Sequence, residues 1–291
     1  MAHLSQRRSQ NVAGDLYVDS TCIDCDTCRW MAPEVFSRSE GQSLVFHQPT
    51  NEAERLRAMQ ALLSCPTASI GTETKPRDIK AVQRSLPALI TDSVYHCGYH
   101  SKNSFGAASY FIQRPEGNVL VDSPRFAPPL VKRLEWMGGV RYLYLTHRDD
   151  VADHAKFQTH FGCDRILHAD DISAGTRDVE IQLFGNKTFQ LAEDLTIIPV
   201  PGHTRGHTVL LYDNRILFSG DHLARSKPLG HLFAFRNACW YSWPEQIESM
   251  KRLAEYSFEW VLPGHGRRYK GDRNTTHRQM QQCIKWMQQS H

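Results

Sequence analysis

The spacing of four cysteines constrains this chain more tightly than any other feature of its sequence. Cys22, Cys25 and Cys28 are separated by two residues each, and a fourth cysteine stands before a proline at Cys65-Pro66. Three thiolates at this spacing can wrap a compact turn and point at one centre, which the distant fourth thiolate completes. The proline fixes a turn beside that ligand. The pattern predicts an iron–sulfur cluster, and a structural zinc site with four cysteine ligands is the alternative.

A small α+β domain is predicted around these cysteines. Strand-like runs occupy residues 16–19, 44–46 and 68–70, and apolar residues recur at helical spacing over 52–63, with Asn51 as the N-cap. We expect the domain to span residues 1–84. A domain of this size buries little apolar surface, so a metal centre would add to its stability.

This segment resembles the single-cluster bacterial-type ferredoxins. The resemblance rests on Cys22, Cys25, Cys28 and Cys65-Pro66, and it implies one [4Fe–4S] cluster bound by the four cysteines. That family sometimes has Asp at the position of Cys25, which favours a three-iron cluster, but this chain has Cys there. The other cysteines are expected to be small buried hydrophobic residues; they are Cys97, Cys163, Cys239 and Cys283.

A second series of candidate ligands follows strand-like runs farther along the chain. Histidines and aspartates occur in four segments, at residues 146–154 (THRDDVADH), 201–207 (PGHTRGH), 219–222 (SGDH) and 263–266 (PGHG). Loops at the ends of strands can hold a site on a rigid scaffold, and the glycines let the backbone turn tightly. Imidazole and carboxylate ligands suit zinc, iron or manganese.

The order of these segments resembles the metallo-β-lactamase superfamily. The resemblance covers residues 89–286, within a second domain expected at 85–291 where strand-like and helix-like runs alternate. It implies an α/β fold: an αββα sandwich of two mixed sheets with helices outside, preceded here by the small ferredoxin-like domain. The family pattern is a His-rich strand end, a Pro-Gly-His-Thr loop, a Gly-Asp bridge and a final Gly-His.

The resemblance also implies a dinuclear site with two divalent ions, zinc or iron. One ion would be held by His147, Asp149 and His203, and the other by Asp153, His154 and His265, with Asp221 bridging the two. Asp153 and Asp221 would be the catalytic carboxylates, and Asp153 could also steer the nucleophile.

The first motif departs from the usual His-x-His-x-Asp-His form. Two extra residues are needed to reach Asp153-His154, and Asp149 stands where the family has an imidazole. Asp150 is an alternative ligand to Asp149. The added carboxylate shifts metal preference from zinc toward iron or manganese without excluding zinc.

Other polar and aromatic residues receive supporting or structural roles. His168, His207 and His222 lie close in sequence to ligands, and we expect them to support the ligands or pack beside them. His96, His100 and His160 have no motif and are interpreted as structural or surface residues. The aromatic stretch 231–243 could line a substrate mouth or pack in the core.

Three functions fit these observations. The first is a metal-dependent hydrolase acting on an ester, thioester or lactone-like small molecule. The second is an oxidoreductase that takes electrons through the [4Fe–4S] cluster to a di-iron centre, with a possible redox partner protein. The third is a redox-responsive binding protein. We expect no glutathione-binding helical domain of the glyoxalase II type in the short segment after His265.

Composition limits the partners. No apolar run approaches the ~20 residues that span a bilayer, so no membrane contact is expected. A formal charge of +3, without a basic tract, argues against nucleic acid. Residues 1–14 lack the apolar segment of a secretory signal and are expected to be a disordered leader. We expect a reducing compartment, the cytoplasm or the chloroplast stroma.

Overall fold

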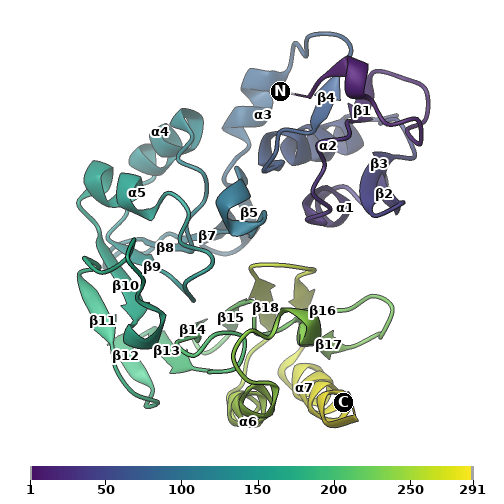
Figure 1. The fold of residues 1–291 in the computed structure, drawn as a ribbon. Helices are drawn as coiled ribbons and strands as arrows, with labels where there is room; N and C mark the ends of the chain where they lie inside the picture. The colour runs from purple at the N-terminus through teal and green to yellow at the C-terminus, as the bar shows by residue number, and fades with distance from the viewer. Residues whose placement is uncertain (1, 290–291) are drawn as a thin grey trace. The chain divides into compact units, whose positions relative to one another are not determined.

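The computed structural model describes residues 2–289 (Figure 1). The chain divides into two compact units. The first unit contains the chain up to Tyr142 together with Ala152–Cys163. The second contains Leu143–Val151 and the described chain from Asp164 onward.

The cysteine-bearing segment of the first unit is a small α+β fold. Strand β1 (Leu16–Val18) pairs antiparallel with β4 (Ile70–Thr72), and β2 (Phe36–Ser39) forms a hairpin with β3 (Gln42–Val45). Helices α1 (Thr27–Met31) and α2 (Glu52–Ser64) complete it. The predicted helix is confirmed, and Asn51 caps it by accepting a hydrogen bond from the Glu54 amide at 2.9 Å. Helix α1 and strand β2 were not predicted.

The expectation of a disordered leader is wrong. Residues Leu4–Gln6 form a short 3₁₀ helix, and Arg7 forms a β-bridge with Asp19 beside β1. The buried Arg8 donates from Nη1 to the Ser43 carbonyl at 2.6 Å. Arginine side chains that bond backbone carbonyls therefore tie this segment to the fold, a role that polar composition alone does not reveal.

The rest of the first unit is an antiparallel meander with helices. Helix α3 leads into strands β5 to β8, in which each strand pairs with the next, and helices α4 and α5 follow. Their bounds are α3 (Ile79–Arg84), β5 (Ala88–Thr91), β6 (Val94–His96), β7 (Tyr110–Ile112), β8 (Val119–Val121), α4 (Pro128–Trp136) and α5 (His154–Phe161). The cysteine segment contacts this meander: Arg125 Nη2 donates to the Leu63 carbonyl at 3.1 Å. A domain boundary near residue 84 stays a prediction.

The second unit contains a six-stranded sheet and a parallel strand pair. The sheet has the order β12-β13-β14-β15-β18-β19, and its pairs are antiparallel except that β15 pairs parallel with β18. Strand β10 lies between β9 and β11 and pairs parallel with β11. The bounds are β9 (Tyr142–Tyr144), β10 (Asp164–His168), β11 (Ile181–Leu183), β12 (Phe189–Ala192), β13 (Leu195–Pro199), β14 (Thr208–Tyr212), β15 (Ile216–Gly220), β18 (Trp260–Pro263) and β19 (Tyr269–Lys270).

Two helices pack together and bury their apolar faces against this sheet. They are α6 (Trp243–Leu253) and α7 (Arg273–Gln289), and a small ribbon of β16 (Ala224–Arg225) and β17 (Leu232–Phe233) lies beside α7 (Figure 1). Ser242 caps α6, and Pro244 stands in its first turn. The shared core includes Val209, Leu217, Val261, Met250, Leu253, Met280 and Met287. Within residues 2–289, no helix combines the length and apolar character needed to cross a bilayer.

Candidate functional site

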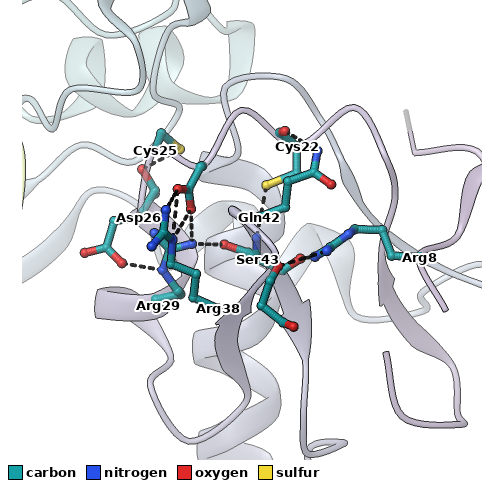
Figure 2. A network of polar contacts seen from close by, with 11 residues as sticks. Arg8, Cys22, Cys25, Asp26, Arg29, Arg38, Gln42 and Ser43 are labelled. Atoms are coloured by element: carbon teal, nitrogen blue, oxygen red, sulfur yellow. Dashed lines mark hydrogen bonds and ion pairs between the residues drawn. The ribbon is translucent and has the colours of Figure 1, made fainter. Parts of the chain in front are cut away.

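Ion pairs and hydrogen bonds between acidic and basic side chains fix the loop that carries Cys22, Cys25 and Cys28 (Figure 2). Asp24 and Asp26 have positive φ values of 60° and 66°, so the loop turns back on itself between the cysteines. The largely buried Arg29 donates to Asp26 at 2.6 Å and to Asp24 at 2.7 Å. Its Nη1 also donates to the Ser43 hydroxyl at 2.6 Å. One guanidinium thus fixes the loop between Cys22 and Cys28 against strand β3.

The four cysteines line one cavity, and their chemistry fits a bound cluster. Burial raises the pKa of Cys25 to about 11 and raises the pKa of Cys28 as well. The thiolate forms of these two residues are therefore stable only beside a strongly cationic group, as cluster iron is. Two backbone amides already point at sulfurs: Ser43 N–H donates to Cys22 at 3.4 Å, and Ser69 N–H donates to Cys65 at 3.2 Å.

A second constellation gathers in the second unit around His147 and His203. His147 follows β9, and His203 stands in the loop between β13 and β14. The two rings lie 4.7 Å apart, and Asp149 Oδ2 stands 3.4 Å from His203 Nε2 and 3.9 Å from His147 Nε2. One ligand atom from each of the three residues lies within 4.8 Å of the others. The structure thus brings together three of the ligands proposed for one ion.

Asp221 and His265 meet because their strands are parallel neighbours. Asp221 follows β15 and His265 follows β18, and the carboxyl ends of parallel strands lie at the same edge of a sheet. His265 Nδ1 lies 2.8 and 2.9 Å from the two carboxylate oxygens of Asp221. Asp221 Oδ2 also lies 3.9 Å from His147 Nε2 and 3.8 Å from His203 Nε2. Asp221 is therefore central to the group.

The buried carboxylate of Asp150 also lies in the group that contains His147 and Asp221. His147, Asp150 and Asp221 offer ligand atoms within 4.8 Å of one another, and all three are buried. A Cβ on Gly264 would stand 2.8 Å from Asp150 Oδ2 and 3.0 Å from Asp221 Oδ1, so only glycine lets this loop approach both carboxylates. Two buried carboxylates side by side repel each other, and a cation between them would stabilise both charges. Asp149 and Asp150 both remain candidate ligands.

The protonation of these groups matches what a metal ion requires. Burial lowers the pKa of His147 and His207, so both imidazoles are neutral at pH 7. Burial alone would raise the pKa of Asp221, but His265, His147 and His203 outweigh it and the pKa is lowered. His147 Nδ1 pairs with the Thr146 hydroxyl at 2.9 Å. Its buried Nε2 forms no hydrogen bond with any residue from 2 to 289 and points into the group as a ligand atom would.

Asp171, which the sequence did not single out, joins two of the ligand loops. It lies in the 3₁₀ turn after β10 (Ala169–Asp171) and is fully buried. Its Oδ2 accepts from the Arg148 amide at 3.1 Å and from the Thr204 hydroxyl at 2.6 Å, and its Oδ1 accepts from the Gly206 amide at 2.8 Å. Its position after a strand, like that of the ligands, is the sequence signal that could have revealed it.

Comparison with known proteins agrees with both halves of this description. Residues 18–72 match the family model of the 4Fe-4S single cluster domain of ferredoxin I, a range that holds all four clustered cysteines. A metallo-β-lactamase from Pontibacter korlensis superposes on 69% of the chain and 97% of its own length, with a TM-score of 0.51 and 17% identity. The BLEG-1 B3 metallo-β-lactamase covers 67% of the chain and 99% of its own length, with a TM-score of 0.52 and 16% identity.

The chain has the metallo-β-lactamase fold. Among curated proteins, the hydroxyacylglutathione hydrolase of Xanthomonas campestris pv. campestris (strain B100) is 29% identical over 154 residues. That of Xanthomonas oryzae pv. oryzae (strain MAFF 311018) is 32% identical over 154 residues. Each alignment covers 51% of this chain and 54% of the relative, so the chain spans about half the length of the curated relatives it matches.

Two predicted ligands of the metallo-β-lactamase pattern, Asp153 and His154, lie in the first unit at the start of α5. Both oxygens of Asp153 have protein donors there: Oδ2 accepts from the Phe126 amide at 2.8 Å, and Oδ1 accepts from Lys156 at 2.7 Å. His154 is buried. Their roles as ligands, and that of Asp153 in catalysis, stay predictions.

The contacts of the supporting histidines differ from those of the aromatic stretch 231–243. His207 Nε2 accepts from the Asp221 amide at 3.2 Å, and His168 Nε2 lies 3.0 Å from the Gly185 carbonyl. Both imidazoles thus bond the backbone of loops. In the aromatic stretch, Trp243 is buried in the core, whereas Trp240 is 61% exposed with its ring 6.2 Å from that of His203. Trp243 therefore packs in the core, and a substrate mouth lined by the stretch stays a prediction.

Proposed function

We propose that this protein is a metal-dependent hydrolase of the metallo-β-lactamase fold that also carries a [4Fe–4S] cluster. Its substrate would be an ester, thioester or lactone-like small molecule. The observation that carries the proposal is the group of His147, Asp149, His203 and Asp221, whose ligand atoms converge around a neutral His147 and an ionised Asp221.

The ligand assignment follows the distances. His147, Asp149 and His203 would hold one ion, and Asp221 with His265 would face the second. Divalent ions in such a site supply a hydroxide nucleophile at neutral pH and polarise the substrate carbonyl. The buried Asp150 adds negative charge beside Asp221, which favours retention of two cations.

The surface beside His203 supports an acyl substrate. The backbone N–H of Trp240 donates to the His203 carbonyl at 2.9 Å, and that of Tyr241 donates to the same carbonyl at 3.1 Å. These bonds hold an exposed indole and a phenol against the His203 loop. An aromatic platform there would bind the apolar part of a substrate. The curated relatives are named hydroxyacylglutathione hydrolases, and this name supports a thioester as the first substrate to test.

A substrate panel tests this proposal. Anaerobically purified protein should hydrolyse at least one of a hydroxyacylglutathione, an acyl thioester without glutathione, a phenyl ester or a lactone, and Asp221→Asn should lose that activity. Trp240→Ala should raise KM for the preferred substrate with little change in kcat, and Trp240→Phe should restore KM. Failure to hydrolyse any member, in protein with its metals bound, would contradict the proposal.

A second function is favoured by one observation, the carboxylate of Asp149 within 3.4 Å of His203 Nε2. Oxygen ligands shift a site toward iron, and a di-iron centre supplied with electrons by the cluster would make the protein an oxidoreductase. In that case the second site would hold iron, and the substrate panel would show no hydrolysis. Oxygen or nitric oxide would then oxidise a chemically reduced cluster faster in the wild type than in Asp221→Asn.

A further inference from the structure

A buried chain of polar contacts leads from the cysteine loop to two histidines that the proposed chemistry does not use. Cys25 Sγ lies 3.4 Å from Thr27 Oγ1, and Thr27 Oγ1 lies 3.2 Å from His100 Nδ1. His100 Nε2 lies 2.8 Å from His96 Nε2. Thr27, His96 and His100 are each at most 2% exposed. All these residues belong to the first unit.

The loop that carries His100 approaches the cluster ligands closely. At Gly106, where φ is +86°, an added Cβ would stand 3.0 Å from Cys25 Cβ and 3.1 Å from its sulfur. The indole of Trp30, which follows Cys28 in α1, lies 5.2 Å from the ring of His96 and 5.9 Å from that of His100. The histidine pair is thus built against the cluster loop.

The protons in this chain can be assigned from its acceptors. The Gly106 carbonyl can only accept, and it lies 2.7 Å from His100 Nδ1, so His100 carries a proton on Nδ1. In a neutral His100, Nε2 then accepts from His96 Nε2–H. Whichever charge His100 carries, Nδ1 cannot accept from the Thr27 hydroxyl.

The Thr27 hydroxyl proton is therefore left with two acceptors. One is the Gly106 carbonyl at 3.3 Å, which already accepts from His100. The other is Cys25 Sγ, which as a cluster-bound thiolate carries no proton and attracts a donor more strongly than a neutral carbonyl. His100 thus turns the Thr27 hydroxyl toward the sulfur.

We propose that His100, backed by His96, positions the Thr27 hydroxyl as a donor to the Cys25 thiolate and thereby raises the reduction potential of the cluster. Donors to cluster sulfurs favour the more negative, reduced cluster. The donors to Cys22 and Cys65 are backbone amides, whereas this donor is set by a side chain from β6 and the loop after it. The proposal rests on the [4Fe–4S] cluster and not on the hydrolytic activity.

The test is an anaerobic redox titration of the full-length protein, monitored by the EPR signal of the reduced cluster. Thr27→Val and His100→Leu should each lower the equilibrium constant for cluster reduction by roughly tenfold, which is 59 mV for a one-electron couple. The double variant should shift no further than Thr27→Val alone, because His100 acts through Thr27. Thr27→Ser and His100→Asn, which keep a hydroxyl and an Nδ1-like donor, should retain the wild-type potential.

Three results would overturn the proposal: an unchanged potential in Thr27→Val, additive shifts in the double variant, or a shift of the same size in His100→Asn as in His100→Leu. If His100→Leu fails to keep its cluster, ENDOR of the serine and valine variants of Thr27 decides. One exchangeable-proton coupling of the wild type must persist in Thr27→Ser and be missing in Thr27→Val, while the couplings of the Ser43 and Ser69 amides persist in both. A wild-type protein without a cluster signal would refute the cluster itself, whereas unchanged potentials beside intact hydrolysis would refute this proposal alone.

Discussion

At the scale of single residues, Asp171 holds the loops of His147 and His203 together without standing among the candidate ligands. Its carboxylate accepts from two backbone amides and one hydroxyl of these loops. Asp171→Asn replaces one acceptor oxygen by a donor and leaves facing donors unpaired. We expect metal affinity, measured by competition with a chromogenic chelator, to fall by about 10–100-fold.

The neighbouring carboxylate provides a matched control for that variant. Asp170 is 43% exposed, and its carboxylate lies 3.5 Å from Arg205. Asp170→Asn should therefore keep the wild-type metal affinity. Equal losses in the two variants would mean that general negative charge, rather than the bonds of Asp171, holds the loops.

Gly264 makes a second prediction at this scale. A Cβ there would meet the oxygens of both Asp150 and Asp221, and neither can retreat without leaving the group. Gly264→Ala should lower metal content and activity together while the protein stays folded by circular dichroism. Gly175→Ala, whose Cβ would meet nothing within 4 Å, should leave both unchanged. Full metal content in Gly264→Ala would show that Asp150 does not belong to the site.

At the scale of elements, an ion pair between Arg165 and Glu180 joins β10 to the residue that precedes β11. The Arg165 guanidinium, 3% exposed, donates to the two oxygens of Glu180 at 2.9 and 2.8 Å, and the Arg165 amide donates to Glu180 at 2.8 Å. These bonds, chiefly that from the Arg165 side chain, lower the pKa of Glu180 from its ordinary 4.5 to about 2.

The lowered pKa of Glu180 decides how the stability of the fold depends on pH. Because the folded-state pKa is depressed, the ionised Glu180 stabilises the fold fully above pH 4.5, and this contribution disappears as the pH falls through about 2. Glu180→Gln should cost about 2 kcal/mol in urea unfolding at neutral pH. The difference from wild type should shrink as the pH is lowered through that window; a constant difference would contradict the role of the charge.

Elements with a strong local signal were predictable. The capped helix α2 and strand β1, at Leu16–Val18, lie where the apolar pattern predicts them. Helix α1 was missed because the five residues Thr27–Met31 are too few to show a periodic apolar face. The ordered start of the chain was missed because its anchors are long-range, as in the bond from Arg8 to the Ser43 carbonyl.

At the scale of the whole molecule, the sequence predicted which residue types gather in each group better than it predicted their contacts. The family pattern predicted that His147, His203, Asp221 and His265 lie in one group. In the structure, Asp221 and His265 meet because the parallel strands β15 and β18 end at the same sheet edge. Spacing alone could not choose between Asp149 and Asp150, because both side chains reach the group. The contact of His100 with Thr27 was beyond prediction, since it joins residues 73 apart in sequence.

The central claim is that one chain binds a [4Fe–4S] cluster and a separate divalent metal centre through two independent residue sets. The most direct test is iron, zinc and acid-labile sulfide analysis of anaerobically purified wild type, Cys65→Ser, Asp221→Asn and Cys239→Ser. We expect about four iron and four sulfide in wild type, with about two further divalent ions.

Cys65→Ser should lose the sulfide with its iron and keep the other ions, Asp221→Asn should do the reverse, and Cys239→Ser should match wild type. Sulfide retained in Cys65→Ser, or divalent ions retained in Asp221→Asn, would contradict the account.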